Sequence, residues 1–133
     1  MYKVVKKDRS IKETLVICHE DGTEALTLDV YINTTSIVSQ MAIAREVLAA
    51  ASGTLQKDPS DVKAMTALGT AVITMLTIIF GAENAKKLVE FYDSAYDALL
   101  VDIYPFIDSE IMPKIREASA ERKAELLAAV NRK

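Results

Sequence analysis

The sequence is poor in the residues on which most enzyme chemistry depends. Its 133 residues include one cysteine, one histidine, four glycines and no tryptophan. The single cysteine, Cys18, cannot form an internal disulfide, which indicates a reducing compartment or a fold that does not depend on redox conditions. The single histidine, His19, leaves no histidine pair for a metal, and the glycines match neither G-x-G-x-x-G nor the P-loop pattern. We therefore expect no enzyme activity, no cofactor and no metal ion.

An excess of basic residues is also missing. Sixteen Lys and Arg against nineteen Asp and Glu give a net charge of −3, whereas nucleic-acid binding depends on clustered cations that neutralise phosphates. The basic cluster near the start, Lys3, Lys6, Lys7 and Arg9, is short. The first ten residues contain no apolar segment of the kind that a signal peptide needs. The sequence predicts a cytoplasmic protein that does not bind nucleic acid.

The apolar stretch from Met65 to Phe80 carries no charge and has to be weighed as a membrane span. It has 16 residues, whereas a bilayer requires about 20. Threonines interrupt this run and Gly81 ends it. It predicts a buried helix, and we expect no membrane association.

Half of the residues are hydrophobic, and the length suits one domain. We predict a single domain, 1–133, in which a small β element (1–32) precedes a bundle of four to five helices (33–133), an α+β fold that is mostly helical. Alternating apolar residues on either side of Asp21-Gly22 predict an antiparallel hairpin closed by a type I′ turn. Tyr2, Val4 and Val5 are candidates for a third strand. A two-stranded hairpin is marginal alone, so we expect it to pack on the helices or to join strands from another subunit.

Helical spacing of apolar residues begins after the hairpin. Ile37, Met41, Ala44 and Leu48 predict a first helix, which begins near residues 33–35 and fades near Gly53. Residues 58–61, Asp-Pro-Ser-Asp, predict the start of a second helix with proline at its first position, and Gly81 predicts its end.

A third helix is predicted over residues 85–103, where a wide apolar stripe repeats at helical period. Pro105 is expected to break or restart it, and Pro113 to kink the chain or start another helix. Ser119 is a candidate cap for a last helix that reaches Val130. Gly69, in the middle of the second helix, suggests a close approach of another helix.

One face of the second helix is unusual because it is polar without being charged. At helical spacing it carries Thr66, Thr70, Thr74 and Thr77. Two readings stay open: a face covered by another helix or subunit, or a central core helix whose hydroxyls bond back to backbone carbonyls. The first reading predicts self-association through these threonines.

The residues that could serve in catalysis or metal binding are better interpreted as structural or solvent-exposed. Cys18 and His19 are neighbours on a predicted strand and point to opposite faces, which prevents a Cys–His nucleophile pair; we expect a buried thiol and an exposed imidazole. Asp93 and Asp97 are one helical turn apart, but no E-x-x-H motif accompanies them, and a solvated face is the simpler interpretation.

Two further sets of residues are interpreted as packing and surface. The aromatic set is expected to be core: Phe91, Tyr92, Tyr96, Tyr104 and Phe106. Alternating charges near the end of the chain predict an exposed helix with internal salt bridges: Lys114, Arg116, Glu117, Glu121, Arg122, Lys123 and Glu125.

Residues 81–115, GAENAKKLVEFYDSAYDALLVDIYPFIDSEIMPKI, carry a family resemblance. The segment resembles the tail assembly chaperones of long-tailed phages and prophages, which often show an LxxFYxxxYxxLL run followed by PFIxxxIxPKI. The second pattern matches closely, from Pro105 to Ile115. The resemblance covers about a quarter of the chain in detail and the remainder by layout only.

The resemblance implies a non-enzymatic protein of the bacterial host cytoplasm, absent from the mature virion. Its partners would be the tape measure protein, whose long aggregation-prone helix such chaperones coat, and the tail-tube protein. Candidate partner-binding residues are Phe91, Ile107 and Ile111, and a homo-oligomer is expected. The alternatives are a structural virion protein, such as a head–tail connector or tail component, and a small helical enzyme or regulator.

Overall fold

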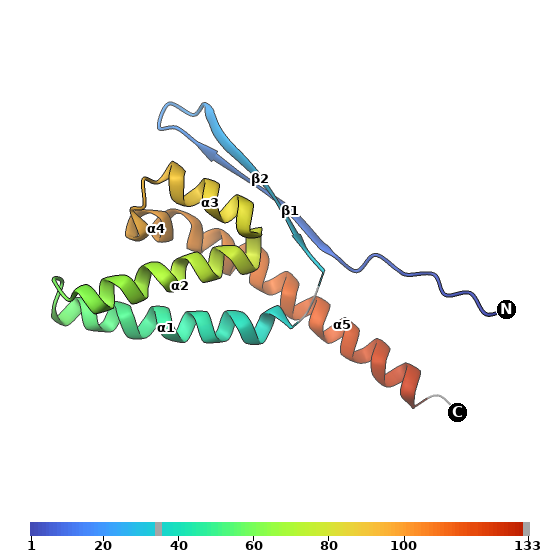
Figure 1. Cartoon of the computed structure of the whole chain (residues 1–133). Coiled ribbons are helices and arrows are strands. Elements are labelled where there is room, and N and C mark those ends of the chain that lie inside the picture. The colour runs from blue at the N-terminus through green and yellow to red at the C-terminus, as the bar shows by residue number, and fades with distance from the viewer. Residues whose placement is uncertain (34–35, 132–133) are drawn as a thin grey trace.

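The computed structural model describes residues 1–33 and 36–131. A two-stranded hairpin, β1 (Ile11–Cys18) and β2 (Glu24–Ile32), comes first. The helices then follow in the order α1 (Ile37–Lys57), α2 (Val62–Phe80), α3 (Ala82–Phe91), α4 (Tyr96–Phe106), a π-helical turn (Ile107–Ile111) and α5 (Met112–Val130). The predicted α+β fold, mostly helical with a small N-terminal antiparallel element, is confirmed (Figure 1).

The hairpin forms where the alternating residues predict it. Ile11 pairs with Ile32 and Leu15 with Leu28, so most apolar residues of both strands lie on one face, and Val16 and Tyr31 are exposed on the other. Its loop differs from the predicted two-residue type I′ turn. A β-bulge follows Ile17, the His19 N–H donates to the Thr23 carbonyl at 2.8 Å, and Gly22 has a φ of +88°. Five residues therefore connect the strands, with glycine at the left-handed position.

The predicted third strand is wrong. Residues 1–10, here called the N-terminal arm, have no regular secondary structure and continue away from the hairpin (Figure 1). Asp8 accepts hydrogen bonds from both the N–H and the hydroxyl of Ser10. This local turn, together with the Arg9–Glu125 ion pair at 2.8 Å, holds the base of the arm beside α5.

Helices α1 and α2 form a helical hairpin whose limits differ slightly from the prediction. The candidate caps Thr34 and Thr35 lie outside the described residues. Gly53 does not end α1, which continues to Lys57. Asp61 caps α2 by accepting from the Ala64 N–H at 2.9 Å, so Pro59 lies in the connecting turn and not at the first helical position. The predicted end at Gly81, with φ +85°, is confirmed.

The predicted third helix is two helices. Asp93 and Ser94 adopt φ angles of 51° and 61°, in the left-handed region, and separate α3 from α4. The break allows both short helices to pack against α2. At Gly69 of α2, an added Cβ would lie 3.0 Å from the Tyr96 ring, so the predicted close approach is confirmed.

The predicted break at Pro105 and the predicted helix start at Ser119 are wrong, because the backbone stays helical from α4 through the π-helical turn into α5. Pro105 lies inside α4, whereas Pro113 lies in the first turn of α5, in agreement with the alternative that it starts another helix. Proline has no backbone N–H to donate to the helix. The wider π-helical turn lies between the two prolines. The Ser109 hydroxyl donates to the Pro105 carbonyl at 2.6 Å.

Helix α2 is the central element of the core. It contacts α1, α3, α4 and β2 and buries Val72, Met75 and Ile79. By length and composition alone this 19-residue helix could cross a membrane, but the same character is expected of a core helix, and its apolar side packs within the protein. The prediction of a buried helix is correct for that side only, because the opposite side of α2 is exposed.

Candidate interaction surface

The threonine face of α2 is open. Thr66, Thr70, Thr74 and Thr77 are all exposed in the chain, so the alternative that they lie in the core is wrong. Two of the hydroxyls do bond back to the helix as expected: Thr66 donates to the Val62 carbonyl at 3.0 Å and Thr77 to the Ile73 carbonyl at 2.7 Å. Self-association through this face stays a prediction.

Two of these threonines form one wall of a shallow groove between α1 and α2. Thr70 and Thr74 line it from α2 together with Ile78, and Ile43 and Val47 line it from α1. The volume is about 370 Å³. Ile43 is 64% exposed and Val47 43%, which is unusual for branched apolar side chains that lie one helical turn apart.

The groove continues toward the loop that joins the two helices. Val47 also lines this second part, about 330 Å³ in volume, with Ala50, Thr54 and Ala67. Charged side chains enter only at the loop end, at Asp61 and Lys63. We call both parts the α1–α2 groove: a long concave strip of small and apolar side chains on a protein in which 26% of residues are charged.

The predicted partner-binding residues do not form a common surface. Ile107 and Ile111 are 1% and 0% exposed and belong to the hydrophobic core, where the π-helical turn points them inward. They are therefore not part of an exposed surface. Phe91 is 40% exposed at the end of α3, with its ring 5.6 Å from that of Tyr92 and 6.4 Å from that of His19. It lies beside the β-hairpin loop and does not line the α1–α2 groove.

The candidate chemical groups are dispersed. Cys18 is exposed, so the expected buried thiol is wrong, and His19 is exposed as expected. Within the described residues, no three His, Cys, Asp or Glu side chains gather as a metal-binding group. Asp102 accepts from the Tyr92 hydroxyl at 2.8 Å; burial, and then this carboxylate, raise the pKa of Tyr92 to about 12.

The remaining aromatic residues pack as predicted. Tyr92, Tyr96, Tyr104 and Phe106 are partly buried against the core. Phe106 stacks on Phe80 of α2 with ring centroids 6.2 Å apart. These side chains therefore stabilise the fold and do not provide an open aromatic platform.

The charged helix α5 is exposed along most of its length, but its ion pairs differ from the prediction. Lys114 pairs with Glu13 of β1, and Glu125 pairs with Arg9 of the N-terminal arm. Between described residues, no ion pair joins two side chains of α5. The Lys114 ammonium holds the pKa of Glu13 below its usual value, and the Arg9 guanidinium does the same for Glu125. These charges attach the start of the chain to its last helix.

Sequence reasoning found the threonine side of the groove and missed the α1 side. Ile43, Val47 and Ala50 repeat at helical spacing beside the buried stripe that contains Ala44 and Leu48. This second apolar stripe could have indicated an exposed binding face on α1, because a helix that packs on one side only requires one apolar stripe.

No protein-family model, no curated protein and no solved structure matches the chain. The resemblance of residues 81–115 to tail assembly chaperones accordingly stays a prediction.

Proposed function

We propose that this protein is a non-enzymatic tail assembly chaperone of a phage or prophage, which holds a helical segment of the tape measure protein in the α1–α2 groove. The observation that carries the proposal is the groove itself, where Ile43 and Val47 remain exposed beside an uncharged threonine wall. The proposed place of action is the cytoplasm of the bacterial host, before the tail is complete.

The chemistry of the groove suits an apolar helix. Amphipathic helices bind apolar grooves through residues spaced at i, i+3, i+4 and i+7. Alanine and threonine are small and uncharged, so a bound helix could approach α1 and α2 closely without burying an unpaired charge. An aggregation-prone client with apolar stripes needs a surface of this kind to stay soluble.

The resemblance supports the same proposal through the fold. The segment from Pro105 to Ile115 forms the end of α4, the π-helical turn and the start of α5. Its isoleucines, Ile107, Ile111 and Ile115, are in the core, and its lysine, Lys114, joins α5 to β1. The pattern therefore describes how the end of α4 and the start of α5 pack in the core. Similarity of this structural kind is expected between chaperones that have no catalytic residues.

Co-expression with a tape measure fragment tests the proposal. The wild-type chain should keep the fragment soluble and copurify with it. Ile43→Asp should weaken the complex about tenfold or more, because it buries an unpaired carboxylate in the interface. It should change the melting temperature little, because Ile43 is exposed.

Val101→Asp is the matched control. Val101 is an exposed branched residue of α4 that does not line the groove, and its substitution should leave the complex intact. A wild-type chain that neither solubilises nor binds the fragment would overturn the proposal. Mass spectrometry that finds the chain in purified virions would favour a structural tail component instead.

A further inference from the structure

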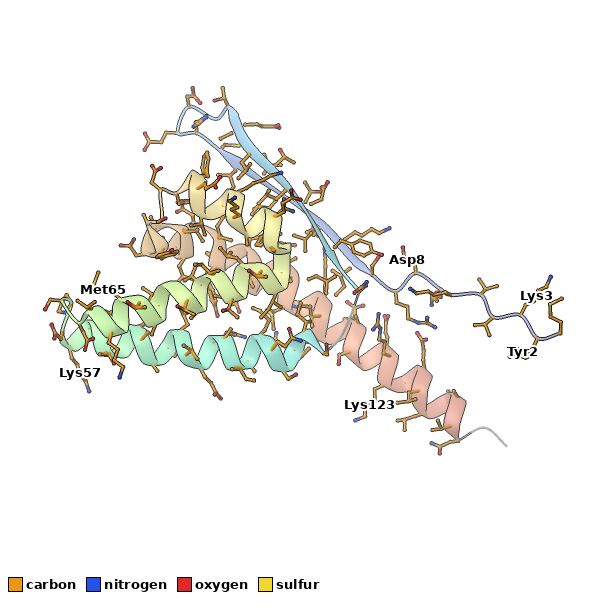
Figure 2. The ribbon with its side chains drawn as sticks, in the orientation of Figure 1. Tyr2, Lys3, Asp8, Lys57, Met65 and Lys123 are labelled. Carbon is orange, nitrogen blue, oxygen red and sulfur yellow. The ribbon has the colours of Figure 1, made fainter. Side chains whose placement is uncertain are left out.

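The N-terminal arm and the outer edge of β1 each have no strand paired with them within the described residues. Tyr2, Val4 and Val5 are exposed almost completely, although aromatic and β-branched residues favour strands. Figure 2 shows Tyr2 and Lys3 at the far end of the arm, away from the folded body. In the part of the chain that the structure describes, β1 pairs with no strand other than β2, so no strand covers the outer edge of β1.

The two edges of the hairpin differ. On β2, Leu28, Val30 and Ile32 are buried, and the Asn84 side chain of α3 donates to the Asp29 carbonyl at 3.5 Å. On β1, the inward residues are only half-buried: Ile11, Leu15 and Ile17. Helix α5 contacts β1 near its start, through Lys114 and Glu13. The free edge is therefore the part of β1 that approaches the hairpin loop.

Charge and length indicate which chain fits this edge. Residues 19–24, at the hairpin loop, include Glu20, Asp21 and Glu24 and no lysine or arginine, whereas the arm carries Lys3, Lys6 and Lys7. An arm aligned antiparallel to β1 would bring Lys3 to this acidic loop. Residues 2–7 have nearly the length of the eight-residue strand β1.

We propose that the N-terminal arm of a second copy of this chain adds to the free edge of β1 as a third, antiparallel strand. Main-chain hydrogen bonds would provide the binding, as in other cases of strand addition, and the sheet edge would be covered. The chain's own arm is directed elsewhere by the Asp8–Ser10 turn and the Arg9–Glu125 pair. The inference concerns self-association and does not rest on the proposed chaperone function.

A proline substitution in the arm tests the contact in the purified full chain, without any client. We expect sedimentation equilibrium to show self-association of the wild type. Val5→Pro should raise the dissociation constant about tenfold or more, because proline removes a donor from the added strand. The matched control is Val62→Pro, since Val62 is an exposed first residue of α2, where proline is tolerated. It should associate as the wild type does.

Disulfide trapping identifies the contact and its two chains. A Lys3→Cys, Cys18→Ser chain mixed with the wild type should form a mixed disulfide to Cys18 under mild oxidation. A Lys57→Cys, Cys18→Ser chain should not, because Lys57 is at the far end of α1 (Figure 2). A monomeric wild type, unchanged association of Val5→Pro, or an internal disulfide in the Lys3→Cys single variant would each overturn the inference. None of these results depends on tape measure binding.

Discussion

At the scale of single residues, the Tyr92–Asp102 hydrogen bond is the contact with the clearest pH signature. It joins the end of α3 to α4 across the left-handed turn at Asp93 and Ser94. Burial and the nearby carboxylate disfavour the phenolate, which raises the pKa of Tyr92 from 10.0 to about 12. The folded state therefore holds the phenol proton more tightly than the unfolded chain does.

This difference predicts how stability changes in alkaline solution. Because the folded pKa is the higher one, the contribution of Tyr92 is complete below pH 10 and is lost as the pH rises from 10 toward 12. Tyr92→Phe should remove that pH dependence and lower the free energy of unfolding at pH 7 by at most about 1 kcal/mol, because the contact is partly solvated. Urea unfolding between pH 7 and pH 11 measures both effects.

Asp102→Asn is the matched control for this prediction. The amide keeps a hydrogen-bond acceptor for Tyr92 and removes the negative charge, so the pKa of Tyr92 should fall part of the way toward its usual value. Ultraviolet titration of the phenolate follows that change. A Tyr92 that ionises in the native protein with an unshifted pKa would contradict the prediction.

At the scale of elements, the α1–α2 hairpin determines the shape of the groove, and the Asp61 cap fixes its turn. Asp61→Ala should destabilise the protein by about 1 kcal/mol, because the Ala64 N–H loses its partner at the start of α2. Asp61→Asn keeps a capping oxygen and should cost much less. Chemical denaturation of the three proteins makes the comparison, and equal losses in both variants would show that the cap is not the cause.

Elements were predictable from the sequence where one local signal decides the structure. Alternation defined the inward face of β1 and β2, and Gly81 ended α2, because these patterns reflect burial on one side or a positive φ. The α3–α4 break was not predictable in this way. Asp93 and Ser94 hold left-handed angles without a glycine, and packing of both short helices on α2 compensates for that cost.

The same distinction applies to the prolines and to the candidate surface. Pro105 is a local helix-breaking signal, but the chain stays helical past it, with Ile107 and Ile111 buried on the next turn. The threonine face was visible as a stripe in the sequence. Its partner wall on α1 was not, because which of two apolar stripes stays exposed depends on the helices that pack beside them.

At the scale of the whole molecule, stability is distributed unevenly between the core and the projecting end of α5. Figure 1 shows α5 extending past the helices that surround α2. From Lys123 to Val130 its side chains are exposed, including Leu126, Leu127 and Val130. The Arg9–Glu125 ion pair is an exposed one, and such pairs contribute little to stability. A helix end without tertiary packing is marginal in water.

Hydrogen exchange should therefore distinguish two parts of this protein by their amide exchange rates. In the isolated chain, amides of residues 123–130 should exchange much faster than those of residues 71–79 in α2, because local opening at the end of α5 exposes little apolar surface. Leu127→Ala should lower the melting temperature only slightly, whereas Leu76→Ala should cost roughly 2–5 kcal/mol as a buried α2 residue. Slow exchange at residues 123–130 in a verified monomer would contradict this account. Slow exchange that appears only as the protein concentration rises would instead place the end of α5 within the contact between copies.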